Sequence, residues 1–191
     1  MSRRLLIVPI LHTEAELGSE GGAHRADFIA RHGDRRWTER EALTGRYWQA
    51  VHDALLELPI EFEGVKLYQD SLPDGPGTER LVEEMAAHGS PNHHLLRLLQ
   101  ARGARVMGTE SLSLLLEEYQ AIKERRDSPE LLRRSLEARD RYIAGRIAGT
   151  LAEGEIGILF IGAAHDVARH CDPAIQVAVL ASGTPQRRDT Q

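Results

Sequence analysis

The feature that most constrains the fold is a set of short apolar runs whose hydrophobicity is continuous rather than alternating. Strands of a parallel sheet have this composition because helices cover both of its faces. The predicted strands span residues 5–11, 65–68, 104–107, 156–161 and 175–180.

Patterns of helical spacing lie between these runs. Residues 43–58 carry apolar side chains at helical intervals, and Pro59 closes that helix. The serine–proline pairs that begin at Ser90 and Ser128 are typical helix starts, and a further amphipathic stripe covers residues 112–122. Strands that alternate with helices predict an α/β fold with a mostly parallel central sheet and helices on both faces.

Length and composition limit the classes of protein to consider. The 191 residues suit one α/β domain over residues 1–181, followed by a polar tail over 182–191. The net charge of -5 argues against nucleic acid as a partner. A single cysteine fits a reducing compartment, so we expect a cytoplasmic protein. No run approaches the ~18 apolar residues of a membrane span, so we expect no membrane partner.

Two segments near the N-terminus need separate interpretation. The run 5–11 follows two arginines and resembles the start of a signal peptide. However, it is short, contains Pro9 and leads into His12 without a small-residue cleavage pattern, so we predict a strand. The polar, glycine-rich segment 18–34 predicts a mobile loop.

Ionisable residues follow four of the predicted strands. His12 follows the first strand, Asp70 the second, Glu110 the third, and His165 with Asp166 the fourth. Because the carboxyl ends of parallel strands meet at the edge where such sheets bind ligands, we expect these residues to share a site. The alternative for either histidine is a ring that caps a strand end or bonds a loop.

One arginine lies on an otherwise apolar helix face. Arg139 falls between Leu136 and Ile143 in the helix predicted after Ser128. An unpaired buried guanidinium is costly, so Arg139 needs an anion. Its partner would be a strand-end carboxylate, such as Asp70 or Glu110, or a substrate oxyanion. The alternative is an arginine whose head group reaches solvent.

Weaker candidates include two histidines and the cysteine. His93 and His94 lie near a helix start and are predicted to be surface residues. Cys171 is predicted to be an ordinary small side chain rather than a nucleophile. The chain has no Gly-x-Ser-x-Gly elbow, which argues against an ordinary α/β-hydrolase.

The stretch around Arg139 and His165 resembles the superfamily that includes TraB-like proteins, ChaN, the erythromycin esterases and the TIKI metalloproteases. It combines an arginine-bearing helix with a strand that ends in Gly162-Ala-Ala-His165. Pro9-Ile-Leu-His12 would occupy the position of a second Gly-x-x-His motif, with Pro9 in place of its glycine, and Asp70 would be the carboxylate after a following strand. The resemblance implies a ChaN-like and erythromycin esterase-like core.

Histidines and carboxylates brought together suit two kinds of hydrolytic chemistry, for which we expect the site residues His12, Asp70, Glu110, Arg139 and His165. His12, His165 and a carboxylate, chiefly Glu110, would hold a divalent ion such as Mn, Co or Zn, whose water attacks an ester or amide carbonyl of a small-molecule or peptide substrate. Arg139 would stabilise the oxyanion or fix a carboxylate.

Two other hypotheses stay open. A metal-free hydrolase would use one histidine as general base. A module of the same fold without catalysis would hold a small ligand or a metal complex in the cleft, which the altered motif at Pro9 favours.

Overall fold

The computed structural model describes residues 2–14, 21–124 and 128–180. Its centre is one sheet in which all strand pairs are parallel and the spatial order is β3-β2-β4-β1-β5. The strands are β1 (Arg3–Ile10), β2 (Lys66–Gln69), β3 (Arg105–Met107), β4 (Ile156–Gly162) and β5 (Ile175–Val179). The α/β prediction is therefore confirmed, and the five predicted strands agree with the observed ones to within two residues at each end. The predicted tail, 182–191, lies outside the described residues.

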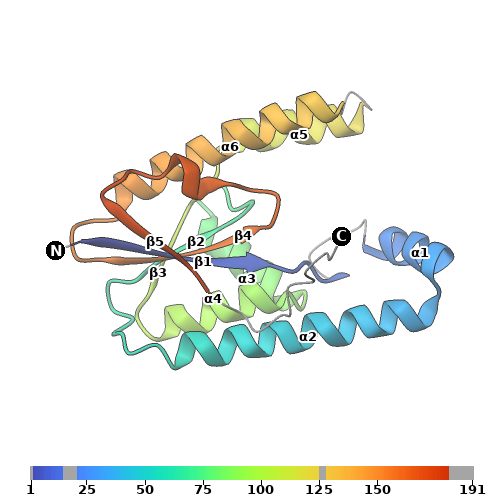
Figure 1. Ribbon diagram of the computed structural model, residues 1–191, viewed down its shortest axis with the longest axis horizontal. Helices are drawn as coiled ribbons and strands as arrows, with labels where there is room; N and C mark the ends of the chain where they lie inside the picture. The colour runs from blue at the N-terminus through green and yellow to red at the C-terminus, as the bar shows by residue number, and fades with distance from the viewer. Residues whose placement is uncertain (1, 15–20, 125–127, 181–191) are drawn as a thin grey trace, which may run out of the picture.

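Helices cover both faces of the sheet (Figure 1). One layer contains α2 (Asp34–Leu56), α3 (Thr78–Ala87) and α4 (Pro91–Ala101). The opposite layer contains α6 (Pro129–Thr150), with α5 (Leu112–Lys123) packed against it and the short 3₁₀ helix η2 (Val167–His170) beside it. Helix α1 (Gly21–His32) packs against α2. None of these described helices is both long and apolar enough to cross a bilayer.

Strand β1 shows how the sequence builds two cores. Val8 and Ile10 belong to the core that includes α2 and α4, whereas Leu5 and Ile7 belong to the core that includes α6. Successive side chains of a strand point to opposite faces, and both faces here are covered. The continuous hydrophobicity of this run follows directly from that double burial.

The described part of the segment 18–34, residues 21–34, is not the loop that its composition predicts. Residues 15–20 lie outside the described part, but α1 covers Gly21–His32 and α2 begins at Asp34. The Phe28 ring packs edge-on against Trp37, with centroids 5.5 Å apart. Long-range packing of two aromatic rings thus stabilises helices where glycines and polar residues suggested a loop.

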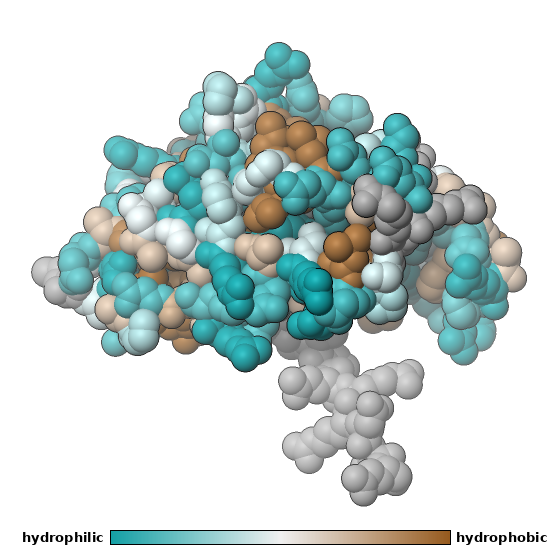
Figure 2. Space-filling view, turned by 90° about the horizontal axis from the view of Figure 1, so that it is seen from above, coloured by the Kyte–Doolittle hydropathy of each residue, from teal (hydrophilic) through white to brown (hydrophobic). Residues whose placement is uncertain are grey.

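Two helical features also differ from the sequence patterns. Helix α3 was not predicted, because its buried face is limited to Val82 and Ala86. Apolar side chains of α5 remain exposed, namely Leu112, Leu116, Tyr119 and Ile122. Figure 2 looks down on the side of the molecule that carries α5 and α6, and its hydrophobic residues form separate small areas among hydrophilic ones.

The topology creates a crevice at the carboxyl edge of the sheet. Strands β1 and β4 are neighbours, but the chain leaves β1 toward the α2 layer and leaves β4 toward η2, which packs on α6. Diverging connections after adjacent parallel strands open the position where α/β sheets bind ligands. His12 and His165 follow these two strands.

Candidate functional site

Three of the predicted residues converge at this edge. Asp70, Glu110 and His165 each offer a metal-ligating atom, and these atoms lie within 4.8 Å of one another. Arg139 reaches the same cluster from α6. The sequence prediction that strand-end groups meet is confirmed for Asp70, Glu110 and His165. His12 is not part of that close group but lies beside it.

Arg139 is buried, with 5% of its surface exposed, and its guanidinium contacts three carboxylates. Nη2 donates to Glu110 Oε1 at 2.6 Å and to Asp70 Oδ1 at 2.9 Å, Nε donates to Glu110, and Nη1 donates to Glu118 Oε1 at 3.1 Å. The predicted partners Asp70 and Glu110 are confirmed, and the alternative of an arginine reaching solvent is wrong. With each of its nitrogens on a carboxylate, Arg139 fixes these groups rather than facing a substrate.

In this network, charge pairing shifts the pKa values of Arg139 and Asp70 more than burial does. Burial alone would lower the pKa of Arg139, but Glu110, Asp70 and Glu118 raise it above its ordinary value. Burial would raise the pKa of Asp70, but Arg139, the Gly162 N–H and, when its ring is protonated, His165 hold it below its usual range. Asp70 and Arg139 are therefore both ionised at neutral pH.

His165 is held by a carboxylate that the sequence analysis did not single out. Its side chain is 4% exposed, and Nδ1 lies 2.5 Å from Asp140 Oδ1. Asp140 Oδ2 in turn accepts the N–H of Asp166 at 2.8 Å. Because a carboxylate accepts hydrogen bonds, this contact places a proton on Nδ1, so Nε2 is the ring nitrogen left to exchange a proton. Nε2 lies 3.6 Å from Asp70 Oδ2.

Gly162 lies at the point where both histidines and Asp70 meet. A Cβ on Gly162 would lie 3.1 Å from Asp70 Oδ2 and 3.8 Å from both His12 Nε2 and His165 Cδ2. The Gly162 N–H also donates to Asp70 Oδ2 at 3.1 Å. A side chain at the glycine of the Gly162-Ala-Ala-His165 motif would thus crowd the Asp70 carboxylate.

The residues present fit a divalent cation in charge and in donor type. Two ligand atoms about 2.1 Å from a tetrahedral ion lie about 3.4 Å apart, close to the separation of His165 Nε2 and Asp70 Oδ2. The cluster has four carboxylates and one guanidinium, so it carries excess negative charge. Those groups are Asp70, Glu110, Glu118, Asp140 and Arg139. Arg139 contacts both Glu110 and Asp70, but Glu110 is fully buried and Asp70 is 9% exposed, which makes Asp70 the more accessible carboxylate.

A pocket of about 200 Å³ opens beside this cluster, and its lining includes His12, Asp70 and Ser71. Ser71 has φ 61°, a left-handed conformation that is uncommon outside glycine. Its N–H donates to Glu110 Oε1 and its hydroxyl to Asp70 Oδ1. Gln69, another lining residue, is buried and its Oε1 has no partner among the described residues. The turn after β2 therefore presents strained and unsatisfied groups to the pocket, as functional sites often do.

His93 is not the surface residue that was predicted. It is 8% exposed and lines the same pocket as His12, with Nδ1 contacting Ser90 Oγ at 2.7 Å. Burial, with a smaller effect of His94, lowers the pKa of His93 to about 4, so its ring is neutral at pH 7. His93 is buried because α4 begins at the pocket and the third residue of this helix points inward. His94 is exposed, as expected.

Of two further site residues, the sequence pattern indicates one and not the other. Asp140 lies four residues after Leu136 and three before Ile143, so it shares the buried face of α6 that singled out Arg139. Glu118 lies among polar residues of α5 and carried no such signal. Cys171 is half-buried, and burial and Asp172 raise its pKa, so its thiol is not activated.

Comparisons with protein-family models, with curated proteins and with solved structures found no match for this chain. The likeness to the TraB, ChaN, erythromycin esterase and TIKI superfamily therefore stays a prediction from the sequence.

Proposed function

We propose that this protein hydrolyses an ester or amide bond of a small-molecule or peptide substrate at the carboxyl edge of its sheet. The observation that carries the proposal is the pairing of His165 with Asp140, whose contact is 2.5 Å. A histidine oriented through Nδ1 by a buried carboxylate has Nε2 available to take a proton, which is the requirement for a general base.

The chemical step follows from this orientation. His165 Nε2 takes a proton from a water molecule, and the water oxygen bonds to the carbonyl carbon. The same nitrogen returns the proton to the leaving oxygen or nitrogen as the bond to the carbonyl carbon breaks. Asp140 stabilises the imidazolium that forms in between. His12 and Asp70 line the adjoining pocket, where they contact the substrate.

Arg139 supports this chemistry as a positioning residue. It holds Asp70 and Glu110 together, and each of its three side-chain nitrogens already contacts a carboxylate. Of the two roles predicted for Arg139, fixing a carboxylate is better supported than stabilising an oxyanion.

A divalent metal is a second way to activate the water. Asp70 and His165 would hold it, with His12 or Glu110 as a further ligand, and manganese, cobalt and zinc all accept such a set of nitrogen and oxygen donors. The ion would supply a water of lowered pKa.

The test is a panel of ester and amide substrates assayed with wild type, His165→Gln and Asp140→Asn. We expect a loss of about 10²–10⁴ in kcat in both variants. Glu137→Gln, which changes an exposed carboxylate three residues before Asp140, is the matched control and should keep full activity.

A chelator distinguishes the metal-free hydrolase from the metal-dependent one. Activity that survives a strong chelator supports His165 as an unaided base. Activity that is lost with the chelator and restored by manganese, cobalt or zinc supports the metal version. A folded protein that retains a copurified ligand and turns over nothing on the panel would overturn the hydrolase proposal in favour of a binding module.

A further inference from the structure

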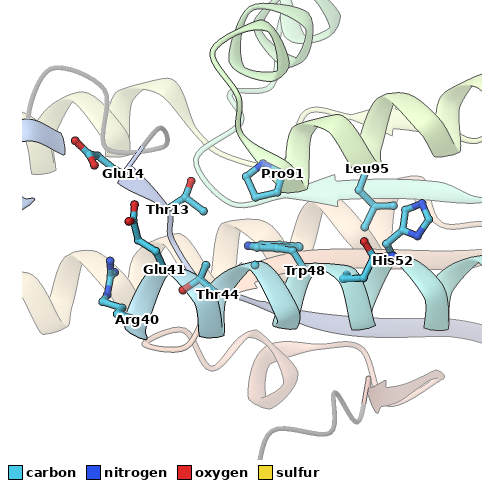
Figure 3. A pocket seen from close by; sticks show the side chains of 11 residues that line it. Thr13, Glu14, Arg40, Glu41, Thr44, Trp48, His52, Pro91 and Leu95 are labelled. Carbon is cyan, nitrogen blue, oxygen red and sulfur yellow. The ribbon is translucent and has the colours of Figure 1, made fainter. Parts of the chain in front are cut away.

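A second hollow of about 400 Å³ lies beside the proposed site, between α2 and α4 (Figure 3). Its side chains come from these two helices and from the segment after β1. We call this hollow the ring pocket. The proposed chemistry does not use its residues.

The ring pocket has an apolar end and a charged end. Figure 3 shows Pro91 and Trp48 in the middle of the pocket, and Leu95 with His52 at the end away from Glu14. The indole is fixed in place, because its Nε1 donates to Leu11 O at 3.0 Å. The indole is 5% exposed, so it offers the pocket a small apolar area beside the half-buried Pro91 ring, against which another ring can pack.

The charged end is acidic. Glu14, Glu41 and Arg40 gather at the other end of the pocket in Figure 3. Arg40 directs one nitrogen to His12 O at 3.2 Å, and its guanidinium lies 5.1 Å from the Trp37 ring centroid. Two carboxylates against one engaged arginine favour a ligand that donates hydrogen bonds or carries positive charge.

Gly45 leaves room for such a ligand. It lies inside α2, where glycine weakens a helix, and it lines the pocket. A Cβ placed on Gly45 would have no atom within 4 Å. Glycine therefore makes α2 less stable at a position where a larger side chain would extend into the pocket.

The ring pocket adjoins the catalytic pocket at two points of the chain. Thr13 and Pro91 line the ring pocket, whereas the preceding His12 and the following Asn92 and His93 line the catalytic one. A substrate bound across this boundary would place one part on Trp48 and another beside His12.

We propose that the ring pocket binds a flat ring-bearing group of the substrate whose far end carries a hydrogen-bond donor, such as an ammonium or a hydroxyl group. The role of this group in catalysis rests on the proposed hydrolase function, but its binding does not. The substrates are then esters or amides of ring-bearing alcohols or amines, with the ring on Trp48 and the donor at Glu14 and Glu41.

The experiment measures binding of two simple probes, phenethylamine and phenylpropionate, to the full chain. Emission of Trp48, excited at a wavelength selective for indole in a Trp37→Phe background, reports occupancy, and calorimetry on the wild type provides a second readout. We expect phenethylamine to bind saturably and phenylpropionate to bind at least about fivefold more weakly.

Gly45→Leu should weaken phenethylamine binding by about tenfold or more, because the new side chain fills the pocket. The matched control is Gly145→Leu, which adds the same side chain at an exposed glycine of α6 with no atom within 4 Å of its Cβ, and binding should not change. Thermal unfolding of both variants verifies that they are folded.

Equal phenethylamine binding in wild type and Gly45→Leu, or equal affinity for the two probes, would overturn the proposal. Probe binding without any ester or amide turnover would support the ring pocket while the hydrolase proposal fails. Turnover without probe binding would overturn the ring pocket and leave the hydrolase proposal standing.

Discussion

His165 and His12 follow neighbouring parallel strands, yet the protein holds them in different ways. At the β4 end, the side chain itself is fixed, because Asp140 binds the His165 ring and the ring is buried. At the β1 end, the backbone is fixed instead. Tyr47, Trp48 and Arg40 of α2 donate to the carbonyls of Pro9, Leu11 and His12, in that order. The His12 side chain is exposed.

This difference assigns the two histidines different tasks. A general base needs its reactive nitrogen held in one orientation, which the β4 end provides. A residue that contacts substrate at a pocket mouth needs a fixed position along the chain, which the β1 end provides. Three stability measurements and one NMR experiment test whether the two strand ends differ in this way.

The largest effect should come from removing the charge that supports the β4 end. Arg139→Met leaves Glu110, which is fully buried, without its counter-ion and should lower the free energy of unfolding by about 3–5 kcal/mol. The equivalent change at the β1 end, Arg40→Met, removes one bond to a carbonyl and the contacts with the Phe28 and Trp37 rings, and should cost about 1–2 kcal/mol. Denaturant titrations measure both, and similar losses in the two variants would contradict the comparison.

The next effect concerns the buried histidine on the His12 side of the site. The pKa of His93 is lowered to about 4 by burial, so the unfolded chain binds an extra proton between about pH 6.5 and 4. Stability should therefore fall as the pH drops through this window, by about 3 kcal/mol in total.

His93→Gln should abolish that fall in stability. The matched control, His88→Gln, changes an exposed histidine and should keep it. Unfolding free energies measured between pH 7 and pH 4 test the prediction, and an unchanged slope in His93→Gln would disprove it.

A smaller effect is expected at Gly162, between the two histidines. Gly162→Ala brings a methyl group to 3.1 Å from Asp70 Oδ2, closer than to either ring, and should cost about 1–3 kcal/mol. Gly149→Ala adds a methyl group in open space on α6 and should stabilise the protein by up to about 1 kcal/mol. If both variants were more stable than the wild type, a methyl group at Gly162 would not crowd Asp70.

Much of the fold could be predicted from the sequence because the sheet is buried on both faces. The runs that became β1 and β4 are apolar at nearly every position, and the serines before α4 and α6 accept hydrogen bonds from His93 and Leu131, as capping residues do. Helices with weak local signals were missed. Helix α1 depends on the contact of Phe28 with Trp37, and no local pattern reports that contact.

The site was predictable where strand order alone placed its residues. Asp70, Glu110 and His165 needed the rule that parallel strands end at one edge, and Arg139 needed its place on an apolar helix face. Asp140 shared that face and could have been found by the same reasoning. His93 could not, because its burial depends on how α4 approaches the pocket, and Glu118 could not, because nothing in α5 distinguishes it from its exposed neighbours.

The central claim is that Asp140 fixes the His165 ring with its proton on Nδ1. Nitrogen-15 NMR of the imidazole rings at neutral pH, with His165→Gln for assignment, measures this directly. For the neutral His165 ring we expect the Nδ1–H tautomer, and loss of that preference in Asp140→Asn. A His165 ring protonated on Nε2 alone, or one whose tautomer is unchanged in Asp140→Asn, would contradict the account.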